Sequence, residues 1–304
     1  MDLLSETLAL LDARCVVSGG FRAGGDWGIS FPAPGRIKFS AVMQGECWLV
    51  VDGSSPLRLA DGDVVVFSGR HPFTLCSTLD AAPVDALAAF SGSQGNMVLI
   101  GSGEEFQYLG GHVELVRSGG DLLLDALPPV LHVDVEKSAA TPIRALLKEL
   151  DREMALSQPG SDLAATHIAS LIFVHVLRVH IAGADLLDSG WLRALGDAHI
   201  APALRLMHGD PGRSWQLDEM ARAVGMSRTS FASRFRSIVG MPPGAYLANW
   251  RMRLAERELR DSSLSVAQIG RSLGYMSEAA FSNAFKRLKG MAPLHYRSSC
   301  RALS

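Results

Sequence analysis

The stretch GYMSEAAFSNAFKRLKGMAPLHYR, residues 274–297, decides the fold of the carboxyl-terminal third of this chain. It repeats a pattern that first appears as GMSRTSFASRFRSIVGMPPGAYL at residues 225–247. Both copies contain a glycine, a serine, two phenylalanines four positions apart, and then a glycine, a proline and a tyrosine. The pairs separated by 50 positions are Ser227 and Ser277, Phe231 and Phe281, Phe235 and Phe285, Gly240 and Gly290, Pro243 and Pro293, and Tyr246 and Tyr296.

A shorter amphipathic segment precedes each copy and completes the pattern. Its apolar residues recur three and four positions apart, which places them on one face of a helix. A glycine then supplies the turn, and the serine beyond it is suited to cap the next helix. Ser265 and Gln268 also fit a capping box, which fixes where the second short helix begins. The sequence therefore predicts two helix-turn-helix units, at about 215–240 and about 264–290.

Charge is divided unevenly along the chain, although the net charge is only −2 over 304 residues. Residues 201–304 contain 16 Lys and Arg against 7 Asp and Glu, a net of +9, whereas residues 1–200 contain 13 against 24, a net of −11. A basic segment that contains two helix-turn-helix units is typical of a protein that neutralises DNA phosphates. A helical-repeat array is disfavoured, because such arrays need three or more stacked units.

These residues carry a resemblance to a known family. Roughly residues 198–299 resemble the DNA-binding domain of the AraC/XylS transcription regulators, and the match is most specific from Gly274 to Arg297. The resemblance implies a central helix from about Pro243 to about Arg260 that joins the two units. Its roughly 27 Å, at 1.5 Å per residue, is close to the roughly 34 Å of one DNA turn. Both recognition helices are therefore expected to enter successive segments of the major groove.

The residues expected to approach DNA follow from helix geometry and from the resemblance, because inward-facing phenylalanines leave the opposite face of each recognition helix outward. Asn283 is suited to pair with adenine, and Lys286 to meet a phosphate. Many family members have an arginine at the position of Ser233, so guanine reading by the first unit is in doubt. For each residue the alternative is an ordinary exposed helix face. The predicted DNA-binding residues are Arg228, Thr229, Ala232, Ser233, Arg234, Arg236, Ser277, Ala279, Ser282, Asn283, Lys286 and Arg287.

The first 135 residues consist of short β-rich runs broken by Gly, Asp and Pro. Such spacing predicts a sandwich or barrel, and Asp52-Gly53 and Asp61-Gly62 are typical of tight hairpins. The segment resembles the cupin-like β-barrel that stands at the N-terminus of many AraC-type regulators. The predicted strands are Ile37–Val42, Cys47–Val51, Asp63–Phe67, Phe73–Cys76, Met97–Ile100 and His112–Val116.

Metal chemistry is disfavoured in this barrel. Cupins that are enzymes usually bind a metal through two histidines and a glutamate on one strand and a later histidine, because such metals need several converging ligands. The matching stretch, Gln44–Trp48, has no histidine pair, and His71 alone is a poor site. The four cysteines show neither metal spacing nor a disulfide framework. We predict no catalytic residue, metal or cofactor; a metal-dependent cupin enzyme fused to a DNA-binding domain remains the alternative.

Sensing is the role that remains for the barrel, because a closed sheet has an interior that is filled by side chains or holds one small ligand. Aromatic residues in a small barrel most often form its core, and a barrel that only dimerises is a further alternative. The candidate effector-binding residues are Trp27, Phe31, Arg36, Phe39, Trp48, Phe67, His71 and Phe73.

Two helices are expected between the barrel and the basic tail, at about 142–156 and about 162–181. The second is apolar on more than one face, so it is expected to be buried against the barrel or in a dimer interface. Its length and its polar interruptions argue against a membrane span.

The sequence thus predicts an α+β multidomain protein. Residues 1–135 are expected to form a cupin-like regulatory domain, residues 136–197 a helical linker and dimerisation segment, and residues 198–304 an all-α DNA-binding domain. No N-terminal signal is visible, so a cytoplasmic location is expected. The expected function is sequence-specific regulation of transcription, with activation favoured over repression. The expected partners are promoter DNA, RNA polymerase, an unknown small-molecule effector and a second copy of the chain.

Overall fold

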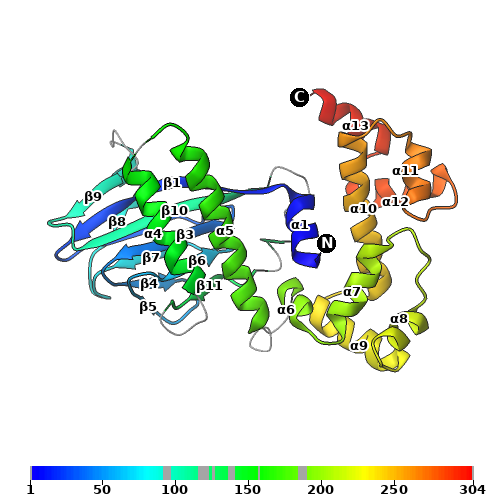
Figure 1. The fold of residues 1–304 in the computed structure, drawn as a ribbon, viewed down its shortest axis with the longest axis horizontal. Helices are drawn as coiled ribbons and strands as arrows, with labels where there is room; N and C mark the ends of the chain where they lie inside the picture. The colour runs from blue at the N-terminus through cyan, green and yellow to red at the C-terminus, as the bar shows by residue number, and fades with distance from the viewer. Residues whose placement is uncertain are drawn as a thin grey trace. The chain divides into compact units, whose positions relative to one another are not determined.

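The structure is a computed structural model that describes residues 2–91, 97–115, 123–124, 127–135, 141–156, 158–183 and 190–302. The chain forms two compact units (Figure 1). The barrel unit comprises residues 13–114 and 123–182, and the helical unit includes residues 1–12 and 183–304. The sequence-predicted boundaries at 135 and 197 therefore differ from the limits of the compact units. Residues 136–140, next to the first boundary, lie outside the described residues.

Two β-sheets form the barrel unit. The first strand pairs in parallel with the ninth and the second with the eighth. The third strand pairs antiparallel with the sixth and the tenth, and the fourth pairs antiparallel with the fifth and the seventh. The six-stranded sheet has the order β11 (Val130–Val133), β6 (Val64–Phe67), β3 (Lys38–Gln44), β10 (Phe106–Leu115), β1 (Ala13–Gly24), β9 (Met97–Gly101). The five-stranded sheet has the order β5 (Leu57–Leu59), β4 (Cys47–Val51), β7 (Phe73–Cys76), β2 (Gly28–Phe31), β8 (Val84–Asp85).

The predicted strands are confirmed within a few residues, except that β10 begins six residues before the predicted start at His112. The last residue of that prediction, Val116, lies outside the described residues. Five described strands were not predicted: β1, β2, β5, β8 and β11. The apolar pattern of β1 is interrupted by glycines. A Cβ on Gly20 would lie 1.9 Å from the carbonyl oxygen of Tyr108, so the glycine permits the close approach of β1 and β10.

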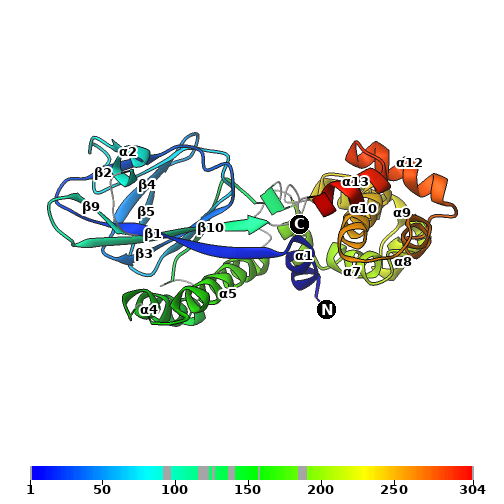
Figure 2. The same cartoon turned by 90° about the horizontal axis from the view of Figure 1, so that it is seen from above.

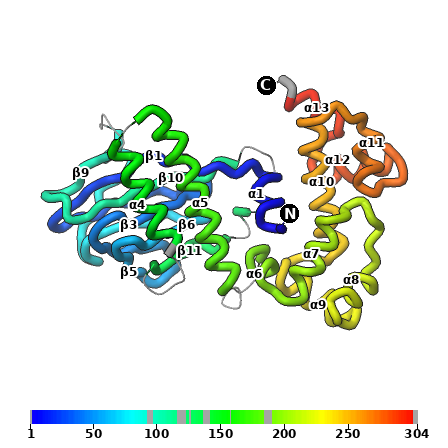
Figure 3. Tube along the Cα trace, in the orientation of Figure 1, coloured from blue at the N-terminus to red at the C-terminus, as the bar shows by residue number. Residues whose placement is uncertain are grey.

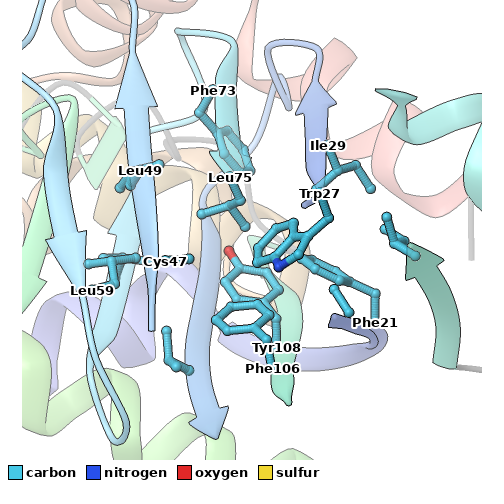
Figure 4. Packing of buried hydrophobic residues seen from close by; sticks show 14 of the residues in the cluster. Phe21, Trp27, Ile29, Cys47, Leu49, Leu59, Phe73, Leu75, Phe106 and Tyr108 are labelled. Atoms are coloured by element: carbon cyan, nitrogen blue, oxygen red, sulfur yellow. The ribbon is translucent and has the colours of Figure 1, made fainter. Parts of the chain in front are cut away.

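Aromatic side chains fill much of the space between the two sheets (Figure 4). The ring centroids of Trp27 and Phe106 are 4.7 Å apart, and those of Phe21 and Tyr108 are 5.2 Å apart. Such contacts bury large apolar areas and give the sandwich its stability.

Two helices, α4 (Thr141–Leu156) and α5 (Ser161–Ala182), lie along one face of the barrel unit, as Figure 2 shows. The two predicted helices are therefore confirmed. α5 packs against α4, β1 and β11, with Ile172, Phe173 and Val176 buried. By length and composition this 22-residue helix meets the requirement for crossing a bilayer, so the sequence-based argument against a membrane span was wrong on those grounds. Its apolar composition has a structural explanation in its packing against the sheet.

The helical unit is organised around one long helix, α10 (Pro243–Asp261). Figure 3 shows one helix pair at each end of it. The first pair is α8 (Leu217–Ala223) and α9 (Arg228–Val239), and the second is α11 (Val266–Ser272) and α12 (Glu278–Lys289). Three further helices of this unit are α6 (Trp191–Gly196), α7 (Ile200–Gly209) and α13 (Pro293–Ala302). The two helix-turn-helix units and the central helix are thus confirmed.

The predicted cap residues are also confirmed. Ser227 and Ser277 accept hydrogen bonds from the backbone amides three residues further on, at 3.2 and 3.1 Å. Ser265 and Gln268 form the capping box at the start of α11. These bonds satisfy amides that an uncapped helix leaves without a partner, so each recognition helix begins at a defined residue.

An N-terminal helix, α1 (Leu3–Leu11), was not predicted and belongs to the helical unit. Leu3 joins the apolar core of that unit, and Oε2 of Glu6 lies 3.4 Å from Nδ1 of His208 on α7. The imidazole of His208 stacks on Trp250 with 3.6 Å between ring centroids and lies 2.8 Å from the Tyr246 hydroxyl. Burial lowers the pKa of His208 to about 3, so this imidazole is neutral at physiological pH.

Candidate nucleic-acid interface

The same aromatic packing holds each recognition helix in place. In the first unit Phe235 contacts Phe231 at 5.7 Å and Tyr246 at 5.8 Å between ring centroids. In the second unit Phe285 contacts Phe281 at 5.9 Å and Tyr296 at 5.6 Å. All four phenylalanines are fully buried. The sequence repeat is therefore a structural repeat, and both helices present their opposite face to solvent.

The predicted DNA-binding residues lie on these outer faces. Ala232 and Ser282 are half-buried and the other ten are exposed. In the second unit Asn283, Lys286 and Arg287 project from α12 within one helical turn. Amide, ammonium and guanidinium groups so arranged match the donors and acceptors of a DNA groove and its phosphates.

Two of the predicted contacts form ion pairs within the helical unit: Nη1 of Arg228 lies 3.6 Å from Oδ2 of Asp218, and Arg234 is held more closely. Its Nη2 donates to Oδ2 of Asp197 at 2.7 Å, and this carboxylate also accepts from the backbone amides of His199 and Ile200. Desolvation raises the pKa of Asp197, but the hydrogen bonds from Arg234 and from those two amides outweigh it, so the pKa is lowered overall. Arg234 therefore ties α9 to the start of α7, which makes it a positioning residue rather than a free side chain on the DNA-facing surface.

A buried ion pair ties the second recognition helix to the central helix. Nζ of Lys289, at the end of α12, lies 2.7 Å from Oε2 of Glu256 on α10. The Glu256 side chain is only 4% exposed, and a carboxylate buried to this degree needs a charged partner. Lys289 thus has a structural partner, whereas Lys286 on the same helix is exposed.

Arg251 on α10 helps to join the two helix-turn-helix units, a role that was not predicted from the sequence. Its Nε donates to the carbonyl oxygen of Pro211 at 2.6 Å, and its Nη2 to that of Arg213 at 2.9 Å. The same loop meets the turn of the second unit, where a Cβ on Gly274 would lie 2.1 Å from the carbonyl oxygen of Gly212. Burial lowers the pKa of Arg251, although its neighbours Tyr275 and Asp210 partly offset this. The spacing of arginines along α10 contains no sign of these contacts.

The central helix, α10, lies between the two helix-turn-helix units. Its 19 residues span about 28 Å at 1.5 Å per residue, somewhat less than the roughly 34 Å repeat of the DNA helix. The length of α10 is therefore close to the roughly 27 Å predicted from the sequence.

The barrel unit contains a cavity of about 570 Å³, and of the eight candidate effector-binding residues only Phe31 lines it. Trp27, Phe67 and Phe73 belong to the core, and Phe39 is buried elsewhere in the unit. Trp48 and His71 are half-buried and Arg36 is exposed. Within the described residues, no group of three or more His, Cys, Asp or Glu side chains is arranged to hold a metal ion. Lys38 and Phe90 also line the cavity, although neither was among the predicted effector-binding residues.

Comparisons with known proteins agree with this architecture. Residues 2–182 match a family model described as Cupin, and residues 220–299 match one described as Helix-turn-helix domain. A protein of Streptomyces antibioticus named as an AraC-like transcription regulator is 41% identical over 298 residues, which cover 98% of each chain. The RCS-specific HTH-type transcriptional activator RclR of Escherichia coli is 31% identical over 53% of this chain and 57% of its own.

A solved DNA-binding domain of the transcriptional factor AdpA, in complex with a target DNA, covers 35% of this chain and 95% of its own, with 30% identity and a TM-score of 0.33. The cupin model spans more than half of the chain, and the Streptomyces relative matches nearly its whole length. The chain therefore belongs to the AraC family of DNA-binding transcription regulators, with a cupin domain preceding a helix-turn-helix domain.

Proposed function

We propose that the helical unit reads a promoter sequence through the outer faces of α9 and α12. The observation that carries the proposal is the pair of similarly packed recognition helices at the two ends of α10. In α12, Asn283 reads a base edge, and Lys286 and Arg287 meet phosphates. In α9 the short side chains of Thr229, Ala232 and Ser233 allow close approach to the groove, while Arg228 and Arg236 flank them. Ser277 and Ala279 begin α12 on the same surface, with Ser282 beside them.

Substituting Asn283 and Lys286 separately is expected to separate sequence reading from phosphate binding. Asn283→Ala should reduce the preference for the selected operator over scrambled DNA by roughly 1–3 kcal/mol, because a base contact distinguishes sequences. Lys286→Ala should weaken binding to both duplexes alike, because phosphates are the same in every sequence. Fluorescence anisotropy on an operator selected from genomic fragments with the purified protein measures both effects.

Ser237→Ala, on the same type of exposed helix surface but outside the proposed contact set, provides the control and should leave both affinities unchanged. Equal losses on operator and scrambled DNA for Asn283→Ala would contradict base reading by this residue. Failure to prefer any duplex over random competitor at physiological salt would reject the DNA-reading function itself.

We further propose that the protein is a cytoplasmic activator whose barrel unit senses a small molecule. The family membership, the cavity in the barrel and the activator name of the Escherichia coli relative support this proposal. Effector binding would shift the population between states that differ in promoter affinity or in contact with RNA polymerase. Regulation rather than catalysis is favoured because the relatives are named as transcription regulators.

We also propose that α5 provides a homodimer contact. Leu163 and Leu171 are 64% and 44% exposed, and their spacing of eight residues places them on one face of the helix, with His167 between them. The opposite face of α5 is already used within the barrel unit. An apolar stripe of this kind on a regulator that acts on DNA is suited to pairing with a second copy.

Leu171→Glu is expected to shift the protein from dimer to monomer, because it places a charge in an apolar contact. Analytical ultracentrifugation at micromolar concentration measures the shift. Leu79→Glu substitutes a comparably exposed leucine, 53% exposed, elsewhere on the barrel unit and should leave the dimer intact. A wild-type protein that sediments as a monomer would reject this contact.

A further inference from the structure

The cavity of the barrel unit has apolar walls and a single charged group. It is lined by segments of β1 and β10, by the short helix α2 (Ala86–Phe90) and by the chain between β2 and β3. Its volume of about 570 Å³ lies within the roughly 300–1,000 Å³ typical of small-molecule sites. Phe31, Leu87 and Phe90 contribute apolar surface, and among the described residues that line the cavity Lys38 alone is charged.

Strand pairing places Lys38 on the interior face of the barrel. In β3 it pairs with Phe67 of β6, while Ser40 two residues later pairs with Val65. Phe67 and Val65 both belong to the core between the sheets. Because side chains alternate between faces along a strand, Lys38 points to the same interior side as Ser40. An ammonium group at an interior position is unusual and needs an explanation.

The surroundings of this ammonium are aromatic. Nζ of Lys38 lies 4.3 Å from the ring centroid of Phe31 and 5.5 Å from that of Phe73. Phe73 stacks with Phe31 at 4.7 Å and with Phe67 at 4.1 Å, so the cation rests against a column of rings. Lys38 is half-buried, and cation–π contacts compensate only part of the hydration that its ammonium group loses.

Among the described residues, no carboxylate forms an ion pair with Lys38, so the rest of the lost hydration is not compensated by a negative charge. Burial alone lowers the pKa of Lys38 to about 8. The cavity therefore combines a cation without a counter-ion and apolar walls with room for a small molecule beside it.

We propose that this cavity binds a small organic carboxylate. The carboxylate pairs with Nζ of Lys38, and its aromatic or aliphatic body packs among Phe31, Leu87 and Phe90. The ligand thus supplies the missing negative charge, and a charge-assisted hydrogen bond inside an apolar cavity is stronger than one between neutral groups. The inference rests on the proposed sensing function and names the chemical class of its effector.

Isothermal titration calorimetry on the full chain tests the proposal with matched probes. Benzoate, 4-phenylbutyrate and decanoate are compared with benzyl alcohol, 4-phenylbutan-1-ol and decan-1-ol. At least one carboxylate is expected to bind one per chain, with its alcohol about 10- to 100-fold weaker, because the alcohol lacks the charge-assisted bond. Lys38→Met is expected to weaken the carboxylate by a similar factor while the alcohol, which depends on the apolar walls, keeps its affinity.

Arg58→Met is the control, because it removes one positive charge from an exposed position on β5 and should leave carboxylate binding unchanged. Retained alcohol binding shows that the Lys38→Met protein is folded. Equal affinities for acid and alcohol, undiminished carboxylate binding by Lys38→Met, or no carboxylate binding at all would each overturn the proposal. Operator binding by the same samples distinguishes the outcomes: if it persists without carboxylate binding, only the effector assignment fails.

Discussion

Raising the salt concentration from 50 to 200 mM is expected to weaken operator binding by about 10³- to 10⁵-fold. This range corresponds to roughly 6–10 neutralised phosphates, whose condensed counter-ions are released on binding. Residues 201–304 contain 16 Lys and Arg, which are enough for such a number even though five of them, Arg213, Arg228, Arg234, Arg257 and Lys289, form ion pairs within the chain. Fluorescence anisotropy with a labelled operator over a series of salt concentrations gives the slope.

Two lysine variants test whether the salt dependence of operator binding arises from the second recognition helix. Lys286→Ala is expected to lower the slope of log affinity against log salt by about 0.9, the contribution of one phosphate contact. Lys148→Ala, which removes an exposed lysine from α4 in the barrel unit, should leave the slope unchanged. A slope near zero for the wild-type protein would exclude phosphate neutralisation as the source of its affinity.

Replacing Gly274 by alanine is expected to destabilise the helical unit by about 3–5 kcal/mol, a range reserved for severe backbone or packing conflicts. The backbone at this turn has a φ of +81°, which costs an L-residue roughly 1–2 kcal/mol. The added methyl group would also lie 2.1 Å from the carbonyl oxygen of Gly212, so the two loops must separate. Their separation would strain the hydrogen bonds from Arg251 to Pro211 and Arg213.

The control is the equivalent glycine of the first unit. Gly225 has a φ of +70°, but a Cβ there would meet nothing within 4 Å. Gly225→Ala should therefore show only the conformational cost of about 1–2 kcal/mol. Urea denaturation followed by circular dichroism and tryptophan fluorescence compares the two variants. Equal losses of stability would contradict the close contact between the two loops.

These two glycines show how far sequence reasoning reaches in this protein. The repeat places both in the turn of a helix-turn-helix unit, and the structure confirms positive φ at both. Nothing in the repeat distinguishes them, because the neighbour of Gly274 is a loop about 60 residues earlier in the chain. α1 illustrates the same limit: Asp2 as a cap and leucines at helical spacing were visible in the sequence, but not the core that Leu3 enters.

The sequence by itself determined the tandem helix-turn-helix units, their caps, the central helix and six of the eleven described strands of the barrel. These features depend on local periodicity and on residues within a few positions of one another, which the order of amino acids records directly. Only the tertiary structure decided which charged side chains are held internally, how Arg251 joins the two DNA-reading units, and that Lys38 faces an apolar cavity. Those outcomes depend on strand register and on contacts between distant segments, where burial and the loss of hydration determine what a charge does.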